Sequence, residues 1–244
     1  MKFIITKDIF ERFPEFRAGV VIAKGIVTNP LPEELKTEFR EAEEKLKQEF
    51  AELEAPSHHP NIKSWREAYK AFGADPGRYN PSNEALARQV LKNRDFLGIH
   101  PLVDIYNYVS IKYVLPVGGE DMDTLEGGLV LDFADGEEEF VRLGGDENDP
   151  PEPGEVVYKD ERGVVCRRWN WREGDRTKIT KDTENAIIVI DTLSPTSEAE
   201  LQKATDELAG LMREYCGARV ETFFVSISNP EFEISKHYIP YSHE

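Results

Sequence analysis

Two polar residues, Asp104 and Asn107, lie on a predicted helix that otherwise lacks a charged face. They are about one turn apart, so both side chains point the same way from a helix. The stretch 101–123 contains one cation, Lys112, and a helix without a charged face is expected to be covered on both sides. Buried polar groups need hydrogen-bond partners, which a ligand can provide. The alternative, that both residues only tie down neighbouring loops, stays open.

A second candidate region, residues 159–181, is basic within an acidic chain. It holds eight Lys and Arg residues against four Asp and Glu residues, a net charge of +4. The total charge of the chain is −17, so the remainder carries −21. A positive island on a negative protein suits a phosphate or the end of a nucleic acid. The candidate binding residues in its core are Arg167, Arg168, Trp169, Asn170, Trp171 and Arg172.

Strand alternation divides these six residues between two faces. Arg167, Trp169 and Trp171 are expected on one side of a strand, and Arg168, Asn170 and Arg172 on the other. Aromatic rings beside cations suit stacking on unpaired bases. Equally, both Trp residues can fill the core while the Arg residues pair with nearby acids, because large aromatic side chains dominate protein cores.

The predicted loop 174–180 extends this region. Its residues Arg176, Thr177 and Lys178 supply donors that suit a phosphate or a carboxylate. His100, just before the predicted helix, is either a general base or a structural residue. The chain contains no glycine-rich phosphate loop and no Gly-x-Ser-x-Gly motif. We therefore expect no cofactor and no metal.

Length and composition narrow the class of protein. The 244 residues are enough for one large domain or two small ones, and 39% hydrophobic content supports a core. The net charge of −17 argues against broad affinity for nucleic acid, including DNA, so an RNA partner has to meet the local basic patch. The two cysteines lack metal-ligand spacing, and no apolar run suits a signal peptide or a membrane span. These features predict a cytoplasmic protein that does not bind membranes.

Hydrophobic periodicity places the elements that must position these residues. It predicts helices at residues 33–54 and 62–72, from 82 to before 98, from 101 to before 116, and from 197 to before 217. It predicts strands at 2–6, 17–27, 127–133, 138–143, 155–158, 164–171, 186–192 and 219–227. We expect a hairpin around Asp135-Gly136, an acidic loop at 144–154, and a tail at 229–244.

The order of elements predicts the fold class. Strands and helices do not alternate regularly, which favours an α+β fold. We expect a layered β-rich sandwich of mixed, largely antiparallel sheets with helices packed outside. No long linker divides the chain, so 1–244 is expected to form a single domain. Its parts are an N-terminal portion at 1–75, a middle region at 76–193, and a C-terminal helix and strand at 194–244.

The middle region resembles a known family. Residues 104–109, DIYNYV, resemble the Asp-x-x-Asn-Tyr-Val segment of the phenylalanyl-tRNA synthetase beta subunit, in its tRNA-binding and editing region, the B-three/B-four domain. Pro116 matches the proline turn that follows in those enzymes, and residues 121–123 match their Asp-x-Asp-like segment. Residues 167–171, RRWNW, and 177–180, TKIT, are similar to freestanding relatives of that domain. No segment resembles a synthetase catalytic core.

The resemblance implies a tRNA-binding protein of translation quality control. Its partner would be the aminoacylated acceptor end of a tRNA, and its activity would be hydrolysis of mischarged aminoacyl-tRNA in trans. The implied catalytic residues are Asp104, Asn107 and Thr177. Two positions depart from the synthetases, which usually carry His at the position of Gly118 and Glu at the position of Arg176.

Three hypotheses of function remain at the level of the sequence. The first is a trans-editing hydrolase, the second a non-catalytic tRNA-binding module, and the third a binder of amino-acid-like small molecules in the same pocket. The amino acid, the tRNA and the oligomeric state are left open.

Overall fold

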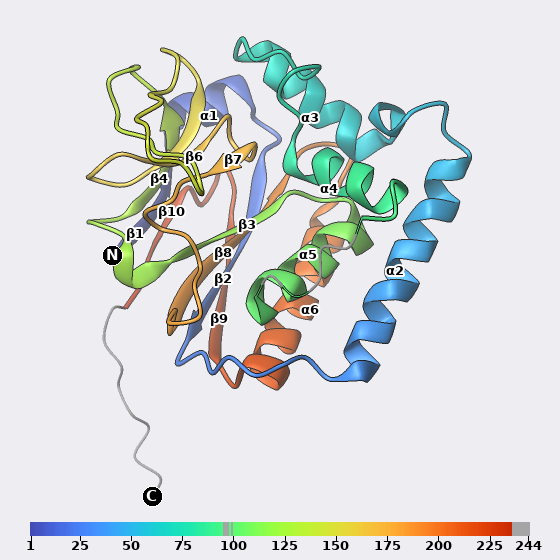
Figure 1. Cartoon of the computed structure of the whole chain (residues 1–244). Coiled ribbons are helices and arrows are strands. Elements are labelled where there is room, and N and C mark those ends of the chain that lie inside the picture. The colour runs from blue at the N-terminus through green and yellow to red at the C-terminus, as the bar shows by residue number, and fades with distance from the viewer. Residues whose placement is uncertain (95–97, 99, 236–244) are drawn as a thin grey trace, which may run out of the picture.

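The computed structural model describes residues 1–94, 98 and 100–235 (Figure 1). Its helices are α1 Lys7–Arg12, α2 Glu33–Ala51, α3 Pro60–Ala71, α4 Ser82–Leu91, α5 Pro101–Tyr113 and α6 Glu198–Cys216, with short 3-10 turns η1 Pro56–His58 and η2 Met122–Thr124. Its strands are β1 Lys2–Ile5, β2 Arg17–Lys24, β3 Val117–Asp121, β4 Leu129–Phe133, β5 Val156–Lys159, β6 Val164–Arg167, β7 Arg172–Glu173, β8 Asn185–Thr192, β9 Arg219–Val225 and β10 Glu231–Glu233.

The strands form two sheets. The six-stranded sheet has the order β10-β1-β4-β5-β6-β7 and the four-stranded sheet the order β3-β8-β2-β9. Strands β1 and β4 are parallel, and the other described pairs are antiparallel. The helices α2, α5 and α6 lie on one side of the four-stranded sheet, and the six-stranded sheet lies on the other (Figure 1). This arrangement confirms the predicted α+β fold.

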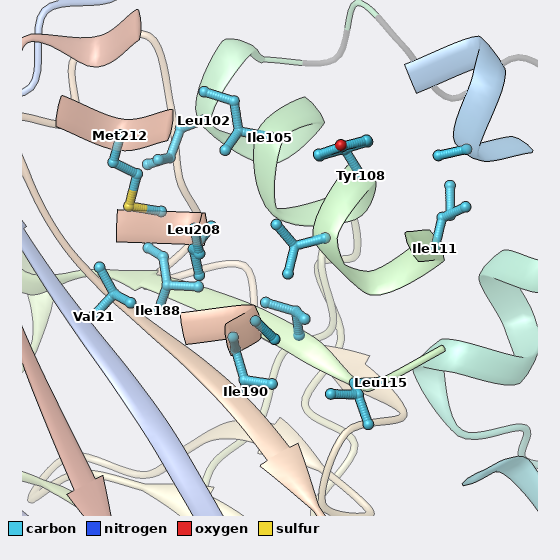
Figure 2. Close-up of a cluster of buried hydrophobic side chains, with 14 of the residues drawn as sticks. Val21, Leu102, Ile105, Tyr108, Ile111, Leu115, Ile188, Ile190, Leu208 and Met212 are labelled. Atoms are coloured by element: carbon cyan, nitrogen blue, oxygen red, sulfur yellow. The ribbon is translucent and has the colours of Figure 1, made fainter. Parts of the chain in front are cut away.

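Strand β2 shows how the sequence builds these layers. Successive side chains of a strand point to opposite faces. Val21 packs with the helices, whereas Val20 and Ile22 pack between the two sheets. Figure 2 shows Val21 and Ile188 of the four-stranded sheet facing Leu208 of α6. The uninterrupted apolar run of β2 is thus explained by burial on both faces.

Helix α6 packs closely on β2 because Gly19 leaves room for it. A Cβ at Gly19 would collide with the Thr205 hydroxyl oxygen of α6. The helix begins with a capping box, in which the Ser197 hydroxyl accepts from the Glu200 backbone N–H and Glu200 accepts from the Ser197 backbone N–H. It ends at Gly217, whose φ of 58° is left-handed. Both predicted ends of this helix are confirmed.

We expect Ser197→Ala to lower the free energy of unfolding by about 1 kcal/mol, because the first turn of α6 loses a cap. Urea denaturation followed by circular dichroism measures this. Ser57→Ala, inside the 3-10 turn η1 and not at its cap, is the control. Equal stability of Ser197→Ala and the wild type would show that the cap adds nothing.

The predicted hairpin at 127–143 is wrong. Strand β4 pairs with β5 instead, and residues 138–143 form only isolated bridges, such as Val141 with Asn148. The Asp135-Gly136 turn is closed locally, since the Glu138 carboxylate accepts the backbone N–H groups of both residues. The excursion from 134 to 155 therefore separates two strands that are neighbours in the sheet.

Helix α5 ends at Tyr113, before Pro116, and its C-cap Val114 has a left-handed φ of 52°. Three further boundaries differ from the sequence prediction. The N-cap of α4 is Pro81, not Ser82, and this helix ends at Leu91, well before Gly98. The predicted tail contains β10, which pairs with β1, and its residues 236–244 lie outside the described residues. No helix within the described ranges has the length and apolar character needed to cross a membrane.

Candidate functional site

A pocket opens between the two sheets. It encloses about 390 Å³ of space, including its open mouth. Strands β3 and β7, which are the end strands of their sheets, both contribute to it, so it lies where two sheet edges meet. Its lining residues are Ser82, Val117, Gly118, Gly119, Glu120, Leu129, Tyr158, Cys166, Trp169, Asn170, Glu173, Ile187, Val189 and Asp191.

Three carboxyl groups line this inter-sheet pocket, and no Lys, Arg or His is among its lining residues. Glu120 of β3 is 5% exposed. Burial, and then the adjacent Glu173, raise the pKa of Glu120 well above its usual range. Burial also raises the pKa of Glu173. Two neighbouring buried carboxyls without a cation hold a proton more tightly than exposed ones.

Asp191 of β8 is the third acid and is held by two hydrogen bonds. The Tyr158 hydroxyl donates to it over 2.7 Å, and the Asn170 amide over 3.4 Å. The Asn170 amide oxygen accepts from the Tyr69 hydroxyl at 2.9 Å, which fixes the amide so that its nitrogen faces Asp191. Burial raises the pKa of Asp191 to about 7 although these hydrogen bonds oppose the shift. A carboxyl with this pKa is suited to general-base catalysis near neutral pH.

The thiol of Cys166 is not an activated nucleophile. It is buried in the pocket wall. Burial, and then the nearby carboxyls Glu173, Glu120 and Asp191, raise the pKa of the Cys166 thiol well above its ordinary value. Since the thiolate is the reactive form, this arrangement favours activation of water over a thioester intermediate.

The segment predicted as a strand through Trp171 is a turn. Strand β6 ends at Arg167 and pairs directly with β7, so residues 168–171 connect the two strands. Arg168 and Trp169 have left-handed φ values of 48° and 65°. The predicted alternation of faces is therefore wrong for these residues, because strand periodicity holds only for extended backbone.

Trp169 leaves this turn for the core. It is 0% exposed, and its ring centroid lies 4.9 Å from those of Phe13, Phe16 and Trp65, all at edge-to-face angles. Trp169 also lines the inter-sheet pocket, and its buried Nε1 has no hydrogen-bond partner among the described residues. Trp169 thus supports the fold and carries an unpaired donor beside the pocket.

Other residues of the turn form a cluster of cations and aromatic rings with Arg78 and Tyr79. Trp171 meets Tyr79 edge to face with centroids 4.8 Å apart. The Arg168 guanidinium lies 3.7 Å from the Tyr79 ring centroid and 4.8 Å from that of Trp171. Arg78 covers Tyr79 at 5.1 Å, and Arg172 covers Trp171 at 5.2 Å. We call these five residues the stacking surface.

Four predicted RNA-binding cations are engaged by acids. The buried Arg167 guanidinium forms two hydrogen bonds to Glu155, at 2.9 and 2.8 Å, and also pairs with Asp149. Arg176 forms a bidentate pair with Asp160, and Lys178 pairs with Asp175 at 2.7 Å. Arg168 is buried and pairs with Glu155 at 3.3 Å, whereas Arg172 is exposed. Asp149 and Glu155, which lie outside residues 159–181, thus offset part of the island's net charge of +4, and Asp160 and Asp175 are acids already counted in it.

The predicted catalytic residues are not among those that line the pocket. The Asp104 carboxylate accepts the Gly98 backbone N–H at 2.8 Å, which holds the loop before α5. Asn107 is half-buried on α5. Thr177 is buried, and its hydroxyl lies near enough to Glu120 to lower the pKa of that carboxyl without forming a hydrogen bond of good geometry. Their assignment as catalytic residues stays a prediction.

His100 is a helix cap. Its Nδ1 accepts the Leu102 backbone N–H at the start of α5, and burial lowers the pKa of its imidazole. This geometry favours a structural role for His100 over the alternative prediction of a general base.

The three pocket carboxyls, Glu120, Glu173 and Asp191, could not be grouped from the sequence because each belongs to a different predicted strand or turn. A Cβ at Gly118 would lie 2.7 Å from the Glu173 Oε1 atom, so Glu173 occupies the space that a side chain at Gly118 would need. The sequence did carry one signal, since Asp191 interrupts the apolar run AIIVIDT of a predicted buried strand. Within the described residues, no cluster of His, Cys, Asp and Glu has the arrangement of a metal site.

The fold and the pocket define a two-sheet α+β domain with an acidic cavity between the sheets. A sequence model of the B3/4 domain matches residues 64–217, which is more than half of the chain and includes every pocket-lining residue. The chain therefore belongs to the B3/4 domain family.

The chain is also similar to a solved structure. This is the crystal structure of an N-terminal fragment of the phenylalanyl-tRNA synthetase beta subunit from Pyrococcus horikoshii, with 12% sequence identity and a TM-score of 0.46. The similarity covers 89% of this chain and 49% of that chain, so the protein spans about half the length of the fragment. No curated protein matches the chain.

Proposed function

We propose that this protein binds the aminoacylated acceptor end of a tRNA and hydrolyses the ester of a wrong amino acid in trans. The observation that carries the proposal is Asp191, a buried carboxyl with a pKa of about 7, oriented by Tyr158 and Asn170 in a pocket that opens to solvent. Membership of the B3/4 family supports it, because the resemblance described above is to the editing region of a synthetase.

In the proposed reaction, Asp191 acts as the general base. Its carboxylate takes a proton from water as the water oxygen bonds to the ester carbonyl carbon. The bond from that carbon to the ribose oxygen then breaks, and Asp191 returns the proton to the leaving oxygen. The products are a free amino acid and an uncharged tRNA.

The oxyanion that forms in this reaction needs hydrogen-bond donors. The Trp169 Nε1 and the Ser82 hydroxyl both belong to pocket-lining residues and lack a partner among the described residues. A buried donor left unpaired is costly in the free protein and becomes satisfied when charge develops nearby. We assign the oxyanion to these two groups.

The stacking surface is the proposed contact for the single-stranded end of the tRNA. Trp171 and Arg168 flank the turn residues that line the pocket, and the Ser82 backbone N–H donates to the Asn170 carbonyl at 3.1 Å. Aromatic rings offer stacking to any base, and arginines contact phosphates. The charge of −17 on the whole chain repels the rest of the tRNA, which limits affinity and makes it salt-sensitive.

We expect the double variant Arg78→Ala/Arg172→Ala to weaken tRNA binding about tenfold or more at low salt. Removal of two phosphate contacts should also reduce the slope of log affinity against log salt by roughly 1.4. Fluorescence anisotropy with labelled tRNA, at salt concentrations from roughly 50 to 200 mM, measures both the affinity and the slope. Arg40→Ala, an exposed arginine of α2, is the matched control. Unchanged affinity and slope in the double variant would remove the stacking surface from the model of binding.

A second function is favoured by the acidity of the pocket itself. A binder of amino-acid-like small molecules would use the same carboxyls and need no nucleic acid. A shift assay with total tRNA separates the two, because this second function predicts no retained tRNA. Retained tRNA without deacylation of any mischarged tRNA tested would instead indicate a non-catalytic tRNA-binding module.

A further inference from the structure

The carboxyl pair of the inter-sheet pocket is incomplete in the free protein. Glu120 Oε2 and Glu173 Oε2 are both buried and have no hydrogen-bond partner of good geometry among the described residues. Both residues line the pocket, and Glu120 is 5% exposed. An unpaired buried carboxyl oxygen costs free energy, and a ligand with donors that enters the pocket removes this cost.

No Lys, Arg or His among the described residues lines the pocket beside this pair, whereas three acids do. Burial raises the pKa of Glu120 and Arg176 opposes this rise electrostatically, but the Arg176 guanidinium is held by Asp160 through bonds of 2.9 and 2.6 Å. Some buried acids elsewhere in the chain do receive basic partners. The side chain of Glu84 is 0% exposed, and its carboxylate pairs with Arg66 and Arg88.

The comparison with Glu84 indicates what the pocket lacks. A buried carboxylate is stable only when it is paired or protonated. At Glu84 the partners are arginines of the chain, whereas Glu120 and Glu173 face each other, with raised pKa values, and both line the pocket. No metal-type cluster occurs within the described residues, so the geometry does not favour a divalent cation. An ammonium group has three donors, no acceptor and a positive charge, which matches two adjacent carboxylates.

We propose that the inter-sheet pocket binds a ligand through a primary ammonium group, which lodges between Glu120 and Glu173. The proposal deepens the proposed function, since it names the group by which the aminoacyl substrate is recognised. Two parts of an aminoacyl ester can supply that group, the α-amino group or an amine at the end of the side chain.

Calorimetric titration of the wild-type protein without tRNA tests the proposal with three probes. Alanine methyl ester carries only an α-ammonium, Nα-acetyl-lysine methyl ester carries only a side-chain ammonium, and Nα-acetylalanine methyl ester carries neither. We expect at least one ammonium probe to bind and the uncharged ester not to bind. The probe that binds identifies the source of the ammonium.

Glu120→Gln and Glu173→Gln provide the matched variants. Glutamine keeps the size of the side chain and resembles the protonated acid, so thermal denaturation should show a folded protein. Loss of one charged partner should weaken binding of the ammonium probe about tenfold or more. Glu221 lies on β9, and its exposed carboxylate pairs with Lys24 of β2, so Glu221→Gln should bind like the wild type.

Three results would overturn the inference. They are binding of the uncharged ester as tight as that of the ammonium probes, no binding of either ammonium probe, and unchanged affinity in both Gln variants. Displacement of a bound probe by millimolar Mg²⁺ or Ca²⁺ would also overturn it in favour of a metal site. Hydrolysis of mischarged tRNA without ammonium binding would leave the proposed function intact, and ammonium binding without hydrolysis would leave only this inference.

Discussion

Asp191→Asn is expected to lower the single-turnover rate of aminoacyl-tRNA hydrolysis by about 10²–10⁴-fold. Burial raises the pKa of the Asp191 carboxyl to about 7, so this group is partly ionised at neutral pH. Asparagine keeps the shape and can exchange hydrogen bonds with Tyr158 and Asn170, but it cannot accept a proton from water. Binding of uncharged tRNA should therefore change little.

The pH dependence gives a second, independent readout of the same prediction. Since the base must be ionised, the wild-type rate should rise with pH up to about 7 and then level off, after subtraction of the uncatalysed hydrolysis. The residual rate of Asp191→Asn should lack this inflection. An Asp191→Asn protein with the wild-type rate and profile would assign the base to another residue.

Stability separates a catalytic loss from unfolding. Burial raises the pKa of Asp191 from 3.8 to about 7 in the folded protein, so the unfolded chain loses this proton first as pH rises. The folded state is therefore destabilised between about pH 4 and pH 7, and the cost persists above that range. Asparagine does not ionise, so Asp191→Asn should be at least as stable as the wild type at pH 8. Asp206→Asn, on the exposed face of α6, is the control for both rate and stability.

The fold was predictable where apolar periodicity is long. Helix α2 and strands β2 and β8 each carry an uninterrupted pattern, and the structure confirms all three. The errors fall where local contacts override the pattern, as before residues 138–143, where the Glu138 carboxylate accepts the backbone N–H groups of Asp135 and Gly136. At residues 168–171, the left-handed φ values of two residues turn the chain, and neither residue is a glycine that would have indicated a turn in the sequence.

The candidate site was less predictable because its parts meet only through the sheets. Glu120 and Glu173 lie on end strands of different sheets, and nothing in their local sequence relates them. The basic island was misleading for the same reason. The acids that pair with its arginines, among them Glu155 outside the island and Asp160 within it, cannot be matched to particular arginines from spacing alone.

Trp169→Ala is expected to lower the free energy of unfolding by about 3–5 kcal/mol. The indole is 0% exposed and contacts three aromatic rings at 4.9 Å, so its removal leaves a cavity beside the inter-sheet pocket. A loss of this size corresponds to a fall in melting temperature of roughly 6–20 °C for a chain of this length. Equilibrium denaturation followed by circular dichroism measures it without relying on tryptophan fluorescence.

Trp171→Ala is the matched control for this stability prediction. Trp171 is in the same turn but is only half-buried, and its partners are Tyr79 and two arginines of the stacking surface. Its removal should cost less stability than that of Trp169, because less apolar area returns to water. It should instead weaken tRNA binding, since one stacking platform is lost. Equal destabilisation by the two substitutions would contradict the assignment of Trp169 to the core and of Trp171 to the surface. It would also contradict the role of this turn as the link between the stacking surface and the pocket.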